Sequence, residues 1–418
     1  MDLCNFIRES ARHYRNELYS SPKLQEFGSE LKISKKSNSF TESVIREMSR
    51  LANKHGAVNL AQGFPDFACP EELKEAASKA IRQDYNQYSV TWGAPVLRQA
   101  IAQKVTEYNK IESDPDKNIV VTCGTTEAMV AAQLATLDPG DEIIVFDPHY
   151  ENYAPDVIIS GARPRYVELD EEDNFALDEE RLKKTFSAKT RGIVLNTPLN
   201  PSGKVFEKEE LKLIADLCNE HDALCYSDEI YEHILYDGAK HVSIGSLPSM
   251  RDRTVTISGF SKTYSVTGWR VGYAISSTKI TGAIKKVHDF LTVGAPHPLQ
   301  IACASALSLP DSYYEKLRND YLRKRDFLLG SLESFGFRCT KPRGAYYIWS
   351  DFTEVDRRLD DLEFAKFLVE KVGVALVPGS SFFHQNGKGR KKVRFTFSKK
   401  METLEKACEN LKVLKKAS

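Results

Sequence analysis

The sequence has no excess of charge of either sign, and this absence argues against two classes of partner. Its 58 lysines and arginines are balanced by 58 aspartates and glutamates over 418 residues. Proteins that bind nucleic acid or an anionic membrane surface usually carry a surplus of basic residues. We therefore expect neither a nucleic acid nor a membrane as a partner.

Cysteines and long apolar runs are also scarce. The eight cysteines are scattered, and no two of them form a CxxC pair. No apolar run approaches the roughly 20 residues of a membrane span, and the first residues lack the apolar stretch of a secretory signal. These absences predict a cytoplasmic protein with reduced thiols, without a disulfide framework or a structural zinc site.

Several catalytic motifs are missing as well. There is no G-x-G-x-x-G, no HExxH and no G-x-S-x-G, and the nine histidines show no ligand spacing. Gly203-Lys204-Val205 lacks the earlier glycine and the Ser/Thr of a P-loop. The sequence therefore indicates no dinucleotide fold, nucleotide triphosphatase or serine hydrolase, and we expect no metal.

Between residues 119 and 258, short apolar runs alternate with helical patterns. The predicted strands are 119–123, 142–146, 164–169, 192–196, 224–227 and 254–258, and the predicted helices include 126–137, 177–186 and 208–221. Such alternation predicts an α/β fold with a mostly parallel sheet flanked by helices.

The pattern changes after Pro310, where a long charged helix and a smaller mixture of helices and strands follow. A chain of this length exceeds one ordinary core. We expect a large α/β domain at 67–310 and a small α+β domain made of 41–66 and 311–418. Residues 1–40 are polar and read as a mobile lead or a surface helix.

In open α/β sheets, ligands bind at the carboxyl ends of the strands. Candidate polar groups follow five predicted strands: Gly124-Thr125-Thr126, Tyr150, Asn200, Asp228 and Lys262. We expect these groups to converge on one edge of the sheet.

Lys262 lies in a turn of small residues, and Arg270 follows it. A lysine can form a Schiff base with a carbonyl, and an arginine can hold a phosphate through two parallel hydrogen bonds. Pyridoxal phosphate (PLP) offers both an aldehyde and a phosphate. A strand–turn–strand with two solvated charges is the alternative interpretation of this segment.

PLP chemistry needs a carboxylate that keeps the pyridine nitrogen protonated, and Asp228 is placed for that role. Tyr231, three residues on, would share its face if a helical turn followed. Its phenol and the Asn200 amide can hydrogen-bond the cofactor's ring oxygen. The alternatives are a helix cap for Asp228, core packing for Tyr231, and a plain turn at Asn200-Pro201, whose peptide bond is a candidate for the cis form.

Three further positions have two interpretations each. Thr125 and Thr126 open a helix, whose free N–H groups suit an anion as well as an ordinary cap. Tyr150 can stack on a pyridine ring or pack in the core. Arg394, inside an apolar strand, needs an anion, either a substrate carboxylate or an internal acid.

As an ordered set, these residues resemble the class I/II aminotransferases, which are fold-type I PLP enzymes. The matched motifs are Gly63-Phe64-Pro65-Asp66, Asn86-Gln87-Tyr88, Asn200-Pro201-Ser202-Gly203, Asp228-Glu229-Ile230-Tyr231, Ser261-Lys262-Thr263, Gly268-Trp269-Arg270 and Val393-Arg394-Phe395. The segments LAQGFPDF and NTPLNPSGKVF are similar to those of the kynurenine aminotransferase, glutamine transaminase K and methionine aminotransferase subgroup.

The resemblance implies a role for each matched residue. Lys262 would bind the cofactor's aldehyde and act as the catalytic base, Asp228 would pair with the pyridine nitrogen, and Tyr150 would stack on the ring. Tyr231 and Asn200 would bond the ring hydroxyl. The phosphate would be held by Thr125, Thr126, Ser261 and Arg270, with Tyr88 reaching it from the partner subunit. Arg394, helped near Gly63, would bind the substrate α-carboxylate.

Two positions depart from the family pattern. Many relatives place a phosphate-binding serine three residues before the lysine, where this chain has Gly259, with Ser258 and Ser261 nearby. The lysine that some bacterial aspartate aminotransferases carry in the helix-opening loop is Thr126 here. The first departure leaves open which serine contacts the phosphate, and the second argues against an acidic-substrate specialist.

The resemblance implies a homodimeric PLP aminotransferase with shared active sites. It would move an amino group from an aromatic, sulfur-containing or other neutral L-amino acid to a 2-oxo acid by a ping-pong mechanism. A PLP-dependent C–S β-lyase on the same fold and a PLP-binding regulatory domain are the alternatives.

Overall fold

A computed structural model describes residues 33–415 of the chain. Most of the predicted N-terminal lead, residues 1–32, therefore lies outside the described residues. Residues 33–41 contain one short 3₁₀ turn, Ser37–Ser39. Among residues 33–415, no helix is long and apolar enough to cross a membrane.

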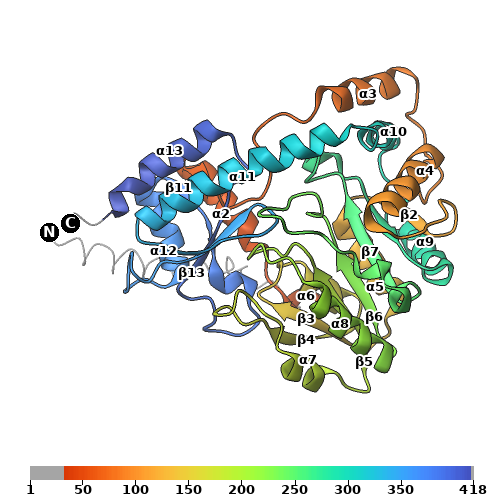
Figure 1. Ribbon diagram of the computed structural model, residues 1–418, viewed down its shortest axis with the longest axis horizontal. Coiled ribbons are helices and arrows are strands. Elements are labelled where there is room, and N and C mark those ends of the chain that lie inside the picture. The colour runs from red at the N-terminus through yellow and green to blue at the C-terminus, as the bar shows by residue number, and fades with distance from the viewer. Residues whose placement is uncertain (1–32, 416–418) are drawn as a thin grey trace, which may run out of the picture. The chain divides into compact units, whose positions relative to one another are not determined.

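The larger sheet has seven strands in the order β2-β8-β7-β6-β5-β3-β4 (Figure 1). Their bounds are β2 Ile119–Thr122, β3 Glu142–Asp147, β4 Arg163–Glu168, β5 Thr190–Asn196, β6 Leu224–Asp228, β7 Thr254–Gly259 and β8 Gly272–Ile275. β8 is antiparallel to both β7 and β2, and the other neighbours are parallel. β2 consequently runs in the same direction as β7, so their carboxyl ends share one edge.

Both faces of this sheet are covered by helices because its strands are apolar on both sides. One face packs against α5 Thr125–Thr136, α6 Tyr153–Ile159 and α9 Thr278–Thr292. The other face packs against α4 Pro95–Lys104, α7 Glu179–Thr185, α8 Lys208–Glu220 and α10 His297–Ala306. Within β2, Val120 faces the first group, whereas Ile119 and Val121 face the second.

A second sheet has four strands in the order β12-β13-β10-β9. These are β9 Arg338–Thr340, β10 Tyr347–Asp351, β12 Val377–Pro378 and β13 Lys392–Thr396, with α11 Asp311–Ser334, α12 Asp361–Phe367 and α13 Met401–Leu411 beside them (Figure 1). β1 Val58–Asn59 pairs with β11 Val374–Ala375, which joins residues far apart in sequence. α2 Val44–His55 and α3 Glu71–Arg82 complete the regular structure. The division into a large and a small domain stays a prediction.

The six strands predicted between residues 119 and 258 all form, with bounds within two residues of the prediction. Strands β9 and β10 and helices α6, α9 and α10 were not predicted. The stretch 374–378 forms two short strands with different partners, β11 and β12. Helix α12 ends at Phe367, and the chain continues as a π-helical turn, Leu368–Val372. Ser43 caps α2 by accepting from Arg46 N.

Candidate active site

The predicted polar groups do converge on one edge of the larger sheet, at the carboxyl ends of its parallel strands, which we call the ligand edge. Asp228 is the last residue of β6, Asn200 follows β5, Tyr150 follows β3 and Lys262 follows β7. Gly124 follows β2, which runs parallel to β7, so the start of α5 lies at the same edge. The alternation of strands and helices thus predicted correctly that these groups lie at one edge of the sheet.

Lys262 points at the backbone of a segment far away in sequence. Its Nζ donates to the carbonyl of Gly63 at 3.0 Å. Burial, followed by repulsion from Arg394, lowers the pKa of Lys262 to about 8, while Asp228 works in the opposite direction. A neutral amine is the form that attacks a carbonyl or accepts a proton, and a pKa of about 8 makes that form accessible near neutral pH.

Asp228 is buried and has a partner that the sequence did not reveal. Its Oδ2 accepts from the hydroxyl of Tyr153 at 2.9 Å, and its Oδ1 accepts from Ile230 N at 3.2 Å. Burial raises the pKa of Asp228 to about 6, and the Tyr153 hydrogen bond limits that rise. Tyr153 therefore helps to keep this carboxylate ionised.

We expect Tyr153→Phe to move the pH dependence of cofactor binding to higher pH. The hydrogen bond favours the ionised form of Asp228, so its loss raises the pKa of that carboxyl further above its usual range. Because a protonated Asp228 cannot pair with a pyridinium, affinity for PLP should weaken at a higher pH than in the wild type. The midpoint can be measured by titrating PLP by absorbance between pH 5 and pH 8.

Tyr150→Phe is the matched control, because it also removes one phenol hydroxyl whose pKa burial raises. No described hydrogen bond joins Tyr150 to Asp228, and the Tyr150 ring instead meets that of Tyr153 edge-on at 5.7 Å. A shift as large in this control as in Tyr153→Phe would contradict the assigned role of Tyr153.

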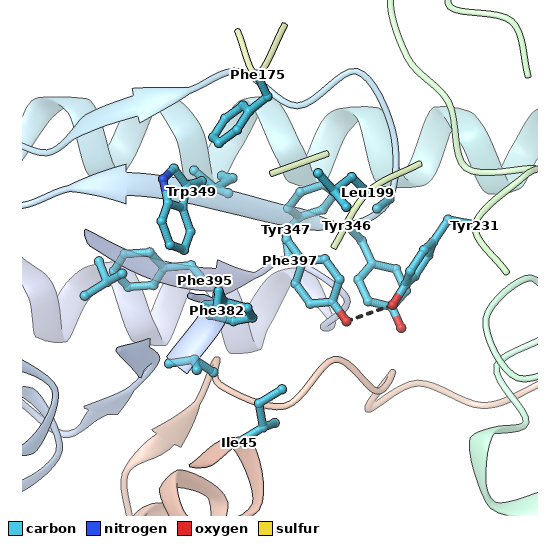
Figure 2. Packing of buried hydrophobic residues seen from close by; sticks show 14 of the residues in the cluster. Ile45, Phe175, Leu199, Tyr231, Tyr346, Tyr347, Trp349, Phe382, Phe395 and Phe397 are labelled. Carbon is cyan, nitrogen blue, oxygen red and sulfur yellow. Dashed lines mark hydrogen bonds between the residues drawn. The ribbon is translucent and has the colours of Figure 1, made fainter. Parts of the chain in front are cut away.

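Tyr231 lies in a turn, not in the helical turn that the sequence suggested, because residues 229–232 close a turn through Glu232 N and Glu229 O at 2.9 Å. Its hydroxyl is 2.9 Å from the hydroxyl of Tyr347, and the two meet among packed aromatic rings (Figure 2). The ring of Tyr346 packs edge-on against Tyr231 with centroids 5.1 Å apart. Tyr346 and Tyr347 are thus neighbours of the site to which the sequence had assigned no role.

Arg394 is fully buried, and among residues 33–415 its guanidinium forms no ion pair. Nη1 donates to Asn200 Oδ1 at 2.7 Å, Nη2 donates to the carbonyl of Ala61 at 2.6 Å, and Nε has no partner. The guanidinium carbon lies 4.1 Å from the centroid of the Tyr347 ring. A buried, uncompensated cation is costly, so this site is suited to an incoming anion. The alternative of an internal acid is not supported.

Residues 61–64, which we call the strap, present backbone carbonyls to three basic side chains. Besides the bonds from Arg394 and Lys262, Lys399 Nζ donates to the carbonyl of Phe64 at 2.7 Å. The hydroxyl of Tyr346 also donates to the Gly63 carbonyl, at 2.7 Å. A Cβ on Gly63 would collide with the hydroxyl of Tyr347. The requirement for glycine is therefore steric.

The start of α5 and Arg270 together form a cradle that we call the anion cup, made of residues 123–127 and Arg270. No side chain in the described part of the chain caps α5 at Gly124, so the first N–H groups of the helix remain open there. A Cβ on Gly124 would meet the Arg270 guanidinium, and one on Gly272 would lie 2.7 Å from the backbone of Gly124. Helix N-termini with an arginine beside them bind phosphate.

The geometry separates the two serines near Lys262, Ser258 and Ser261, as candidates for the phosphate contact. Ser258, at the end of β7, donates to Glu232 Oε1 at 2.7 Å and so faces away from the cup. Ser261 is buried and makes no hydrogen bond among the described residues. Of the two serines, Ser261 is the one with a free hydroxyl.

A buried charged network lies behind the 228–232 turn. Glu229 and Glu232, with His241, offer ligand atoms within 4.8 Å of one another, as a metal site would. Their oxygens already accept from protein donors, such as Ser243 at 2.7 Å on Glu229 and Lys104 at 2.6 Å on Glu232. The network therefore fixes the turn that carries Asp228 and Tyr231.

Two predicted site residues differ sharply in exposure. Tyr88 is 84% exposed and makes no described side-chain contact. Tyr150 is half-buried at the ligand edge, and burial raises its pKa. Asn200 is buried, and its peptide bond to Pro201 is cis, as the sequence suggested.

The donor set fits PLP group by group. Lys262 suits the aldehyde, Asp228 the pyridine nitrogen and the anion cup the phosphate. The Oδ1 of Asn200 is taken by Arg394, which leaves its NH₂ group to donate to a ring oxygen. Every polar group of this cofactor thus has a complementary group at the same edge of the sheet.

Comparison with known proteins agrees with this geometry. The family model for aminotransferase class I and II matches residues 55–411. The chain is 38% identical to the methionine aminotransferase of Escherichia coli K12 over 371 residues, which cover 89% of this chain and 95% of that protein. It is 36% identical to human kynurenine–oxoglutarate transaminase 1, covering 88% and 94% of the two chains.

A solved structure shows the same fold. N-succinyldiaminopimelate aminotransferase from Mycobacterium tuberculosis superposes with a TM-score of 0.89 at 35% identity, covering 92% of this chain and 100% of that one. The match extends over both sheets. The chain therefore belongs to the class I and II aminotransferases, and it is a fold-type I enzyme that uses pyridoxal phosphate.

Proposed function

We propose that this aminotransferase uses the edge site described above, with an aromatic, sulfur-containing or other neutral L-amino acid as donor and a 2-oxo acid as acceptor in a ping-pong cycle. The observation that carries the assignment is the buried Arg394, which forms no ion pair among residues 33–415 and, like Lys262, donates to a carbonyl of the strap. A bound α-carboxylate would compensate its charge.

When bound, PLP supplies an electron sink for the substrate's α-carbon. Lys262 would hold the aldehyde and, once displaced, move the α-proton as base and acid. Asp228 would keep the pyridine nitrogen protonated, while Asn200 and Tyr231 would hold the ring oxygen. Tyr150 would cover the ring, and Thr125, Thr126, Ser261 and Arg270 would fix the phosphate.

The preference for neutral donors has two supports. The side chains around Arg394 are aromatic, with Tyr347 at 4.1 Å and Phe382 at 4.9 Å from ring centroid to guanidinium carbon. Position 126 is threonine, so the helix-opening loop offers no lysine to a second carboxylate. The relatives named above are named for three different substrates: methionine, kynurenine and N-succinyldiaminopimelate. Sequence identity to them therefore does not select one amino donor.

The donor preference can be tested with a panel of amino acids against 2-oxoglutarate and pyruvate, with products identified by mass spectrometry. New amino acid should form fastest from aromatic and sulfur-containing donors. If aspartate or glutamate gave the highest kcat/KM, the proposed preference would be wrong. Release of pyruvate and ammonia from a cysteine conjugate without an acceptor would instead indicate the β-lyase, which the relatives do not favour.

An apolar face supports a homodimer. Its exposed members lie on two segments, at Ile81, Tyr85, Tyr88 and Val90 and at Phe290, Leu291 and Val293, and the contact of His288 Nε2 with Thr91 O at 2.8 Å brings the two segments together. Phe290 is 92% exposed, which is unusual for a large apolar side chain. The face adjoins the anion cup, since Cys123 Sγ lies 3.6 Å from Gly294 O. We propose that a second copy covers it and brings its own Tyr88 to the phosphate.

Hybrid dimers test whether the sites are shared. Lys262→Ala and Tyr88→Ala homodimers should each be impaired, the first severely. If Tyr88 serves the partner's site, a hybrid of the two has one site with both mutations and one intact site. Mixing by unfolding and refolding should then restore activity toward one intact site per hybrid dimer. Activity equal to the average of the parents would mean that Tyr88 serves its own chain.

We also propose a cellular location and a domain division. A cytoplasmic location is supported by the free thiols of all seven described cysteines. A small domain of 41–66 with 311–418 is supported by the pairing of β1 with β11.

A further inference from the structure

A buried ion pair joins the anion cup to the segment that carries Tyr88. Nδ1 of His288, on α9, lies 2.6 Å from Glu127 Oε1, and its Nε2 lies 2.8 Å from the carbonyl oxygen of Thr91. His288 is fully buried, and Glu127 is 8% exposed. Thr292 also donates to Glu127 Oε1, at 2.8 Å.

The contacts define the charge of the histidine. A carboxylate oxygen and a backbone carbonyl both only accept hydrogen bonds, and a neutral imidazole has a single N–H. Both contacts are favourable only if His288 is an imidazolium. Burial is the largest single influence and opposes the charge on each partner, but the mutual hydrogen bond, the charge attraction and the other hydrogen bonds together outweigh it. The pKa of His288 is therefore raised and that of Glu127 is lowered.

Each end of the pair holds one functional segment. Glu127 is the third residue of α5 and also accepts from Cys123 N, so it fixes the backbone turn of the anion cup. Thr91 is three residues from Tyr88, on the apolar face. The same face includes Phe290 and Leu291, which follow His288 on α9.

Neither segment can leave without a cost to the other. If Thr91 moves away, a buried imidazolium N–H loses its acceptor, and if the cup opens, Glu127 loses a donor. Breaking one side of a buried charged pair is strongly destabilising. The two segments should therefore become ordered together.

We infer that His288 is a positioning residue that couples cofactor binding to dimer formation. The contacts of His288 with Glu127 and with Thr91 form what we call the clasp. Phosphate in the anion cup and a second copy on the apolar face each order this clasp, so each strengthens the binding of the other. Such coupling is reciprocal by thermodynamic necessity. The inference rests on the proposed function, because it takes the cup as the phosphate site and the apolar face as the dimer contact.

Two neutral substitutions of His288 each remove one of its two contacts and keep a donor for the other. His288→Asn keeps a donor near the position of Nδ1, facing Glu127, and His288→Gln keeps one near Nε2, facing Thr91. The measurements are the Kd for PLP, by absorbance, and the rate of subunit exchange between differently labelled dimers with and without PLP. His233→Gln is the control, because His233 is another buried histidine, but it packs between Tyr108 and Tyr314.

In the wild type and in His233→Gln, PLP should slow subunit exchange on the order of tenfold. In both His288 variants, this factor should fall toward one and the Kd for PLP should rise. Folded His288 variants that keep the wild-type factor would overturn the inference. A wild type that binds PLP but exchanges at the same rate with and without it would also overturn it.

The outcomes also separate this inference from the function itself. A wild type that does not bind PLP would contradict the proposed function. The other outcomes test only the coupling through His288 and do not affect the proposed function. If neither His288 variant folds, Thr292→Val decides, because it removes one donor from Glu127 and leaves His288 in place. That variant should show a smaller factor than the wild type, and an unchanged factor would overturn the coupling.

Discussion

Lys262→Ala should abolish turnover, with a loss on the order of 10³-fold or more in kcat, because the variant loses both the amine that holds the cofactor and the group that moves the proton. The purified wild type should be yellow, and borohydride should fix the cofactor to a peptide containing Lys262. Peptide mass spectrometry after reduction measures this directly. The variant should still bind some PLP through the anion cup and Asp228.

Lys399 provides a matched control for this experiment. Its pKa is also lowered to about 8, chiefly by burial, and its Nζ donates to the strap as that of Lys262 does. Lys399 nevertheless follows β13 of the smaller sheet and not a strand of the ligand edge. Lys399→Met should therefore keep the reducible colour. Cofactor fixed to Lys399, or to any lysine other than Lys262, would refute the assignment.

Arg394→Lys should lower kcat/KM by about 2–5 kcal/mol, which is roughly 30- to 5000-fold, for every donor with an α-carboxylate. A lysine cannot make the planar two-point contact with a carboxylate. It also cannot keep both present bonds, to Asn200 and to the carbonyl of Ala61. Steady-state kinetics with a donor series give the effect, and amines without a carboxylate should show little change.

Arg325→Lys is the control for the loss of a buried guanidinium. Arg325 has the same burial, 1% exposed, but it pairs with Asp237 at 2.6 Å, outside the site. It should lower stability without a selective effect on carboxylate donors. Equal losses in Arg394→Lys for donors with and without a carboxylate would indicate that Arg394 acts only in packing.

The strands and the ligand edge could be predicted because their signals are local. β2 and β7 are short apolar runs bounded by turn residues, and they begin where the sequence placed them, at Ile119 and Thr254. A polar residue directly after such a run reaches the ligand edge in any parallel sheet. Asp228 and Lys262 therefore needed no knowledge of tertiary contacts.

The partners of these residues could not be predicted, because the contacts join distant parts of the chain. Tyr153 lies 75 residues from Asp228, and Tyr347 lies 116 residues from Tyr231. In sequence, each is one more tyrosine in an apolar stretch, typical of a core. The pair of Glu127 and His288, 161 residues apart, was missed for the same reason. α10 gave no clear helical pattern because small residues fill half of it, as in Ala302-Cys303-Ala304-Ser305-Ala306.

The strap has a consequence for how this enzyme tolerates change. Its contacts to Lys262, Arg394 and Lys399 are made by main-chain oxygens, which every amino acid carries. Gly63 has no room for a Cβ and Ala61 is fully buried, so side-chain size is restricted at these two positions. The carbonyl contacts themselves do not depend on which side chains the segment carries. Insertion or deletion of a single residue would instead move all the carbonyls out of register with their cations. Natural variation in this segment should therefore preserve its length more strictly than its composition.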